Sequence, residues 1–188
     1  MKERKSKSVG GLSTKLHSQR LKSINDPRFS EAWALYQRSF PLSERRKIDL
    51  QQEIFNESRF YFNVFHNGEQ LIGLLNWWVF EDYLFVDHFC TDEKCRGKGL
   101  GAQMMKQLQY STKKPLLLEV EVPDSPMKIR RVRFYQRLGF HLNKYTYQQP
   151  PFHAQGECVD LQVMSYPDPL SAEMYQKLTT EGHQLIYP

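Results

Sequence analysis

Aromatic and branched apolar residues dominate the chain between positions 60 and 90, and turn-forming residues interrupt them at two points. Asn67-Gly68 is a dipeptide favoured in two-residue hairpin turns, and Glu81-Asp82 marks a second turn. The pattern predicts an antiparallel meander of three strands, over 60–65, 71–80 and 83–90.

The apolar spacing then changes to a helical period. Leu100, Met104 and Leu108 lie four residues apart, which predicts a helix from Gly99 to about Ser111. The apolar run over 115–122 that follows predicts a strand.

Another helix is predicted from its end signals. Ser125 followed by Pro126 is a typical helix start, and Gly139 is a typical left-handed helix end. The remaining patterns predict strands over 20–24, 140–147 and 159–166, and helices over 26–39, from 43 onward and over 168–178. The order of elements indicates a mixed α/β (α+β) single domain.

Composition supports a globular chain of one domain. The 188 residues are 40% hydrophobic, and no apolar run approaches the ~20 residues needed to cross a bilayer. The three cysteines lack the spacing of a metal site or a disulfide framework. We expect a cytoplasmic protein with one domain over 20–188, no metal and no membrane association.

The net charge of +5 is distributed unevenly. Residues 1–22 hold seven Lys or Arg residues and one Glu, so the remainder is close to neutral. Such an arm could bind nucleic acid or an acidic partner, but a solvated tail is the simpler interpretation. We expect residues 1–19 to form a disordered basic arm.

Alternating glycines follow the meander where the helix at 99 begins, in the sequence Arg96-Gly97-Lys98-Gly99-Leu100-Gly101. Glycines let the backbone approach a ligand closely, and free N–H groups at a helix N-terminus bind phosphates. A tight turn without a ligand is the alternative. The spacing matches neither a Walker loop nor a dinucleotide fingerprint after a parallel unit.

These glycines resemble the signature of the GNAT superfamily of N-acetyltransferases, Gln/Arg-x-x-Gly-x-Gly/Ala, at Arg96, Gly99 and Gly101. The segment Phe134-Tyr135-Gln136-Arg137-Leu138-Gly139-Phe140 is similar to the helix-to-strand passage of the same family. The two motifs are separated by a strand, as the family requires, and the resemblance covers residues 20–166.

The resemblance implies a mostly antiparallel sheet of about seven strands, splayed between the fourth and fifth strands, with acetyl-CoA in the gap as co-substrate. Backbone groups of Phe89, Cys90 and Thr91 would pair with its pantetheine arm. The pyrophosphate would lie on Arg96, Gly97, Lys98, Gly99, Leu100, Gly101 and Ala102. The family often has Asn and Ala where this chain has Lys128 and Arg131, which puts one cofactor contact in question.

Four residues are candidates for the chemistry. Tyr135 matches the family tyrosine that donates a proton to the CoA sulfur. Glu119 and Glu121 share one face of their strand, and burying two carboxyl groups there is costly unless they are paired with a neighbouring Arg or Lys or face a polar cleft. His88 has a pKa suited to a base but is more often structural. Proton transfer through water would make no single base essential.

The leading hypothesis is an N-acetyltransferase that moves the acetyl group of acetyl-CoA to a primary amine of a small molecule or peptide by direct attack. A non-catalytic acyl-CoA-binding module and a nucleic-acid-associated protein are the alternatives. The sequence identifies neither the amine nor the acyl-chain preference, and it leaves a homodimer open.

Overall fold

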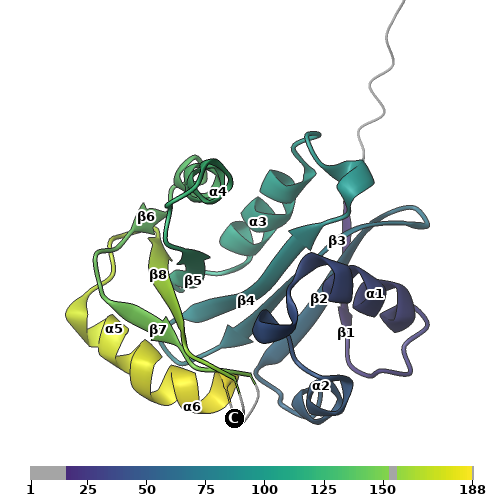
Figure 1. The fold of residues 1–188 in the computed structure, drawn as a ribbon. Helices are drawn as coiled ribbons and strands as arrows, with labels where there is room; N and C mark the ends of the chain where they lie inside the picture. The colour runs from purple at the N-terminus through teal and green to yellow at the C-terminus, as the bar shows by residue number, and fades with distance from the viewer. Residues whose placement is uncertain (1–15, 153–155, 188) are drawn as a thin grey trace, which may run out of the picture.

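The computed structural model describes residues 16–152 and 156–187, and within these ranges the strands form one sheet of eight (Figure 1). The strand order is β1-β2-β3-β4-β5-β8-β6, with β7 also paired to β8. The strands are β1 (His17–Leu21), β2 (Phe60–Asn67), β3 (Gln70–Val79), β4 (Leu84–Thr91), β5 (Leu116–Glu121), β6 (His141–Leu142), β7 (Tyr147–Gln149) and β8 (Val159–Tyr166).

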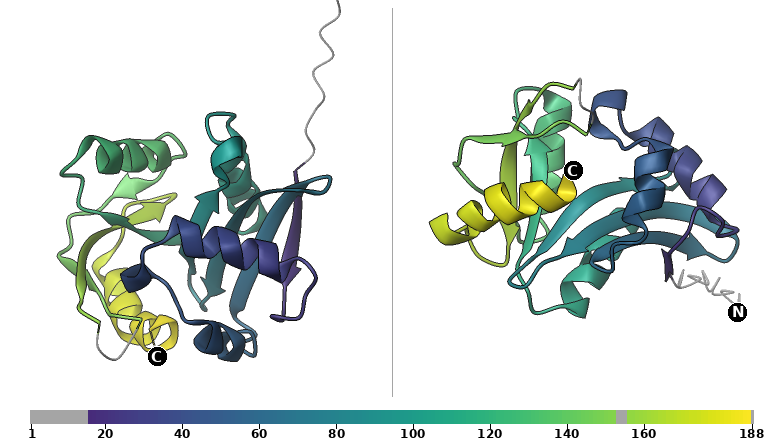
Figure 2. Two further views of the ribbon diagram at one scale, coloured as in Figure 1. Left: turned by 45° about the vertical axis from the view of Figure 1, so that its right-hand side comes forward. Right: turned by 90° about the horizontal axis from the view of Figure 1, so that it is seen from below.

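Helices cover both faces of this sheet (Figures 1 and 2). They are α1 (Phe29–Ser39), α2 (Ile48–Ile54), α3 (Leu100–Ser111), α4 (Pro126–Gln136), α5 (Ala172–Lys177) and α6 (His183–Ile186), with short 3₁₀ turns η1 (Leu42–Glu44) and η2 (Glu93–Cys95) and a π-helical turn η3 (Leu178–Gly182). Two hydrophobic clusters fill the layers. One contains buried residues of α1, α2, η3 and α6, and the other contains those of α3 and α4.

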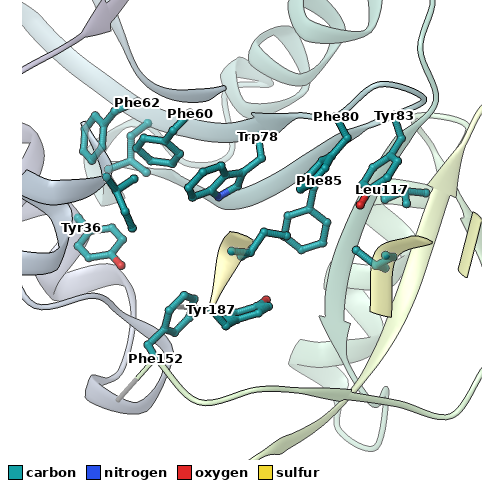
Figure 3. Close-up of a cluster of buried hydrophobic side chains, with 14 of the residues drawn as sticks. Tyr36, Phe60, Phe62, Trp78, Phe80, Tyr83, Phe85, Leu117, Phe152 and Tyr187 are labelled. Atoms are coloured by element: carbon teal, nitrogen blue, oxygen red, sulfur yellow. The ribbon is translucent and has the colours of Figure 1, made fainter. Parts of the chain in front are cut away.

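The first cluster is strongly aromatic (Figure 3). Trp78 of β3 and Phe85 of β4 point into it from the sheet, and both are fully buried. Tyr187, just after α6, lies among these rings, with its own ring centroid 4.8 Å from that of Phe152. Tyr187 is therefore part of the first hydrophobic cluster.

The sheet opens between β4 and β5. These strands form its parallel pair, and their pairing runs from Leu84–Leu116 to Val86–Leu118. Beyond this point β4 continues to Thr91 and β5 to Glu121 without ladder partners for one another. This divergence is the splay that the family resemblance implied.

A β-bulge lies where the splay begins. On β3, Asn76 pairs with His88 while Trp77 pairs with Val86, which leaves Asp87 as the extra residue of β4. Side chains normally alternate between faces, but a bulge interrupts the alternation. Asp87 and His88 consequently both reach the α1 side, where they contact Arg46 and Tyr36.

The predicted central elements are confirmed with small changes at their ends. The helix of the glycine motif begins at Leu100, directly after Gly99, and α4 begins at Pro126 with Ser125 as its cap. Gly139 has the expected positive φ, of 88°. The first hairpin turn is Gly68-Glu69, one residue later than predicted, because Asn67 still pairs with Gln70.

The single strand predicted over 140–147 is wrong, and the sheet has eight strands rather than about seven. Asn143 lies between β6 and β7, and both its backbone N–H and its side chain bond to β8, while the side chain also binds the segment after β8. Its Nδ2 donates to Val163 O and Ser165 Oγ, both at 3.0 Å, and its Oδ1 accepts from Leu170 N at 2.8 Å.

Several outer boundaries also differ from the prediction. β1 begins at His17, so its first residues fall within the predicted arm, whose positions 1–15 lie outside the described residues. This edge strand is mostly exposed and polar, so it lacks an apolar pattern. Helix α1 begins at Phe29, and the predicted second helix is the turn η1 followed by α2. The last helical segment runs from Ala172 to Ile186.

Across the described ranges, the helices are too short or too polar to cross a membrane.

Candidate active site

A cleft of about 1170 Å³ occupies the splay. It is bordered by β4 and β5, by the loop before α3, by α3 and α4, and by the segment that joins α1 to η1. Every site residue predicted from the sequence lines this cleft apart from Lys98; these are His88, Phe89, Cys90, Thr91, Arg96, Gly97, Gly99, Leu100, Gly101, Ala102, Glu119, Glu121 and Tyr135. The structure thus brings residues from four separate elements to one place.

The loop before α3 has a shape that only glycine adopts readily. Gly97 and Gly99 have φ values of 75° and 74°, and no atom lies within 4 Å of a Cβ built on either residue. The positive φ, rather than crowding, explains these two glycines. The free N–H groups of α3 begin directly after them, so the loop and helix offer converging donors to an anion.

Gly101 has a different role. A Cβ at this position would lie 3.3 Å from the Phe89 ring and 3.3 Å from Thr91 Cγ2. Glycine therefore allows the first turn of α3 to approach β4 closely. Arg96, Lys106, Arg130 and Arg137 add positive charge along this part of the cleft, which suits a ligand with several phosphates. These residues fit the CoA part of acetyl-CoA.

Tyr135 reaches the cleft from α4. It is buried beside Phe89, Phe134 and Phe140, and burial raises the pKa of its hydroxyl to about 12. The phenol therefore keeps its proton at neutral pH and can donate it. Burial also raises the pKa of the nearby Cys90 thiol to about 11, so this cysteine is protonated at neutral pH.

A buried ion pair lies across the cleft from Tyr135. Arg46 Nη1 is 2.5 Å from Asp87 Oδ2, and the side chains are 0% and 2% exposed. Burial opposes the ionisation of Asp87, but the charges and hydrogen bonds of Arg46 and His88 outweigh it and hold the pKa of the carboxyl well below its usual range. Asp87 is therefore a carboxylate with a matched cation.

His88 is enclosed within the same network. Its Nδ1 lies 3.1 Å from Asp87 Oδ1, and its Nε2 lies 2.8 Å from the carbonyl oxygen of Glu44 and 3.2 Å from Tyr36 Oη. The residue is 4% exposed. Both ring nitrogens thus face fixed partners, which favours a role in positioning β4 and η1 over direct proton transfer from an acceptor.

Glu119 is the centre of a second polar cluster. Tyr187 Oη donates to its carboxyl group at 2.8 and 2.9 Å from the two oxygens, and Gln149 Nε2 donates at 2.7 Å. Tyr147 Oη donates to the same carboxyl group. Burial raises the pKa of Glu119 to about 7, and the negative charge of Asp87 adds to this, while the hydrogen bonds of the two tyrosines oppose it.

Glu121 lies farther along β5 and is 26% exposed. Arg131 Nη1 donates to its carboxylate, so one of the residues that depart from the family pattern is its partner. The charges of Glu121 and Arg131 also act on Glu44 of η1. Burial, and then the charge of Glu121, raise the pKa of Glu44. The side of the cleft formed by η1 and β5 therefore carries carboxyl groups, in contrast to the basic loop side.

Sequence reasoning missed the partners of the candidate residues. Arg46 stands in a basic run, Arg45-Arg46-Lys47, that looks like an exposed helix start. Tyr147, Gln149, His183 and Tyr187 come from segments that are distant in the sequence and have no motif. A buried acid on an apolar strand was the one signal that such partners must exist. In the described part of the chain, no group of three or more His, Cys, Asp or Glu residues could hold a metal ion.

Comparison with known proteins identifies the family of the chain. The family model described as "Acetyltransferase (GNAT) family" matches residues 25–140. A solved structure from Bacteroides thetaiotaomicron, assigned to the GNAT family of acetyltransferases, is 29% identical. It matches with a TM-score of 0.84, over 91% of this chain and 98% of that one.

Two further relatives differ in their sequence identity to this chain and in the share of each chain that is matched. YjbC of Bacillus subtilis, named for acetyltransferase activity, is 30% identical over 113 residues, which are 58% of this chain and 57% of YjbC. This chain thus matches little more than half of that relative. A GNAT family acetyltransferase from Elizabethkingia anophelis, solved with acetyl-CoA bound, is 14% identical with a TM-score of 0.55, over 80% of this chain and 96% of that one. At this identity the likeness shows the fold alone.

Proposed function

The chain belongs to the GNAT family of acetyltransferases, and we propose that it transfers the acetyl group of acetyl-CoA to a primary amine by direct attack. The observation that carries the proposal is the position of the basic, glycine-rich loop Arg96–Gly101 beside a splay that is lined by a tyrosine and by carboxyl groups. Acetyl-CoA, when bound, supplies the reactive thioester.

Glu119 is the proposed general base. With a pKa of about 7, about half of the Glu119 carboxyl groups are ionised at neutral pH, and the carboxylate is a stronger base than an ordinary one. It lines the cleft, and its partners fix its position. Glu121 is the weaker candidate because Arg131 neutralises it.

Tyr135 is the proposed proton donor to the departing sulfur. Its hydroxyl is held on the cofactor side by packing against Phe89 and Phe134. The raised pKa keeps the donor protonated over the whole working range. Phe89, Cys90 and Thr91 remain the proposed backbone partners of the pantetheine arm, because β4 has left its pairing with β5 at these residues.

Direct attack is preferred over an acetyl-cysteine intermediate. A thiol must lose its proton to become a good nucleophile. The pKa of about 11 for Cys90 leaves this thiol protonated. The positive charges of Arg38 and Arg96 lower this pKa, but burial outweighs them.

The acceptor is proposed to be cationic before it reacts. Glu44 and Glu119 line the cleft and, unlike Asp87 and Glu121, form no ion pair within the described residues. A protonated amine would be attracted there and would find a base to take its proton. Polyamines, amino acid amides and peptides with a free amino group are therefore the acceptors to test first.

The cofactor site is tested by thermal unfolding with and without acetyl-CoA. A ligand at 100 times its dissociation constant adds ~2.7 kcal/mol of stability. The matched variants are Gly99→Glu and Gly99→Gln, which introduce the same backbone strain but differ in charge. We expect the parent to be stabilised, Gly99→Gln less so, and Gly99→Glu not at all. Equal stabilisation of all three would contradict binding at this loop.

Activity is then measured as CoA release across the amine panel, with Tyr135→Phe as the test of the donor. We expect release with at least one cationic amine and at least a tenfold lower rate in Tyr135→Phe. Stabilisation by acetyl-CoA with no release from any amine would instead favour the non-catalytic acyl-CoA-binding module.

A further inference from the structure

A continuous line of polar atoms leads from the cleft to the outside of the molecule through the cluster at Glu119. Glu119 and Gln149 line the cleft, whereas Tyr147 and Tyr187 lie behind them and are buried. His183, on α6, is partly exposed and places its Nε2 2.9 Å from Tyr147 Oη. Tyr147 Oη in turn contacts Glu119 Oε1.

We propose that His183 and Tyr147 form a proton relay that carries the amine proton from Glu119 to solvent. This inference rests on the proposed function, in which Glu119 removes that proton. It adds a route out of the site that passes through Tyr147 to α6. His183 touches neither the acceptor nor the thioester, so it acts through Glu119.

The proton balance is complete at each transfer. The amine N–H bond breaks and an O–H bond forms on Glu119. The Glu119 proton then moves to Tyr147 Oη while the Tyr147 proton moves to His183 Nε2. The imidazolium releases a proton to water, and solvent exchange restores the starting tautomer. One proton has left the amine for solvent, and Glu119 is again a carboxylate.

The two end groups differ in proton affinity, and release to water draws the proton outward. Burial raises the pKa of Glu119 to about 7 and lowers the pKa of His183, so the imidazole holds the proton less tightly than Glu119 does and passes it on to water. Burial, and then the charge of Glu119, raise the pKa of Tyr147, which passes a proton but does not lose one. The groups that face Glu119 are Tyr147, Tyr187, Gln149 and Asp87, and those that face His183 are Tyr147 and Tyr187.

Tyr187 holds the residues at both ends of the relay in position. Its hydroxyl donates to Glu119 and lies 3.1 Å from Gln149 Nε2, and its ring centroid is 5.7 Å from that of His183. The residue therefore fixes both ends at once. Since its hydroxyl contacts the carboxyl group and not His183, Tyr187 is a positioning residue rather than a member of the relay.

The kinetic test uses the full chain and the fastest amine of the panel. His183→Ala should lower kcat at least tenfold, and added imidazole should restore it in a saturable manner, because a small base can occupy the partly exposed position. His183→Gln keeps a hydrogen-bonding partner for Tyr147 but cannot carry a proton, so it should be as slow as His183→Ala. His141→Gln, an exposed histidine outside the cleft lining, is the matched control.

Folding and acetyl-CoA binding are checked in each variant by thermal unfolding, so that a lost structure is not read as a lost relay. Unchanged kcat in His183→Gln, or a loss that imidazole does not restore in a folded His183→Ala, overturns the relay. In both cases the proposed function stands, because the parent enzyme still releases CoA.

A second readout needs no acceptor. Protein labelled with ¹⁵N-histidine is titrated by NMR, and the His183 signal is identified by its absence in His183→Gln. We expect Glu119→Gln to lower the pKa of His183 measurably, because the relay couples their charges, and Tyr147→Phe to weaken that coupling. An identical titration of His183 in the parent and in Glu119→Gln would overturn the relay even if no amine is found.

Discussion

At the scale of one residue, the burial of Glu119 costs stability and also raises the pKa that its proposed role as a base requires. A carboxyl group on an apolar strand costs stability, which the sequence alone already indicates. Its three donors come from β7 and from the segment after β8, so the sequence gives no spacing from which to identify them. The location of the acid could be predicted, but its hydrogen-bonding partners could not, because tertiary contacts alone bring them together.

The base role of Glu119 predicts a pH-dependent rate. With a weakly basic acceptor that is neutral throughout, kcat/KM should rise with pH through about 7 as Glu119 ionises. Glu119→Gln should lose this rise and about a hundredfold of kcat/KM at pH 8. CoA release from pH 5.5 to 9 measures both. A rise of the same shape in Glu119→Gln would assign the titration to another group.

Arg46 is predicted to matter for stability because it neutralises a buried charge. Arg46→Met leaves Asp87 buried without its partner, which should cost about 3–5 kcal/mol in urea unfolding. Replacing both, as Arg46→Met with Asp87→Asn, should recover a large part of the loss. Arg38→Met breaks a more exposed pair with Asp92 and should cost at most about 1 kcal/mol. Equal losses for the two single variants would contradict the argument.

At the scale of elements, the residues that start and end a helix located α4 without help from the spacing of its apolar residues. Ser125-Pro126 and Gly139 located α4 because each has a local steric or hydrogen-bonding cause. The bulge at Asp87 has no such local signal, since it depends on the register of β3 against β4. The break between β6 and β7 was missed for a similar reason, because the partners of Asn143 lie on β8 and beyond it.

Gly73 should be essential to the pairing of β3 with β4. A Cβ there would lie 2.3 Å from the carbonyl oxygen of Cys90 and 3.0 Å from Met104 Cε. Because the closest atom is backbone, Gly73→Ala must displace a strand and should cost about 1–3 kcal/mol or more. Gly68→Ala is the control, with a strained φ but open space around it, and should cost about 1 kcal/mol. Urea midpoints that rank the two variants in the opposite order would contradict this assignment.

At the scale of the whole molecule, the sheet separates two hydrophobic clusters, and the cleft passes between the halves of the sheet. The fold class followed from the order of elements, and the splay followed from the family resemblance. The depth at which the C-terminal helices pack could not be predicted, because Ser171 to Tyr187 has no strong apolar stripe.

Stability should depend on pH through two carboxyl groups of opposite behaviour. Glu119 has a raised pKa, so its stabilising contribution is complete below about 4.5 and is lost as the pH rises through about 7, by on the order of 3 kcal/mol. Asp87 has a lowered pKa, so its contribution is present above about 4 and is lost in acid.

Urea unfolding at intervals from pH 5 to 8 tests the expected loss of stability through Glu119. The stability difference between the parent and Glu119→Gln should shrink, or turn against the parent, as the pH rises. A constant difference over this range would show that Glu119 has an ordinary pKa in the folded protein.

The short pairing of β4 with β5 has a mechanical consequence. Three residues on each strand join the two halves of the sheet, and Arg46 connects β4 to α6, because it pairs with Asp87 and donates to the carbonyl oxygen of Ile186 at 3.3 Å. The two halves of the sheet can therefore move relative to one another at this short pairing. A ligand that spans the gap would restrict this motion. We therefore expect amide exchange to slow on both strands when acetyl-CoA binds, well beyond the residues that acetyl-CoA touches.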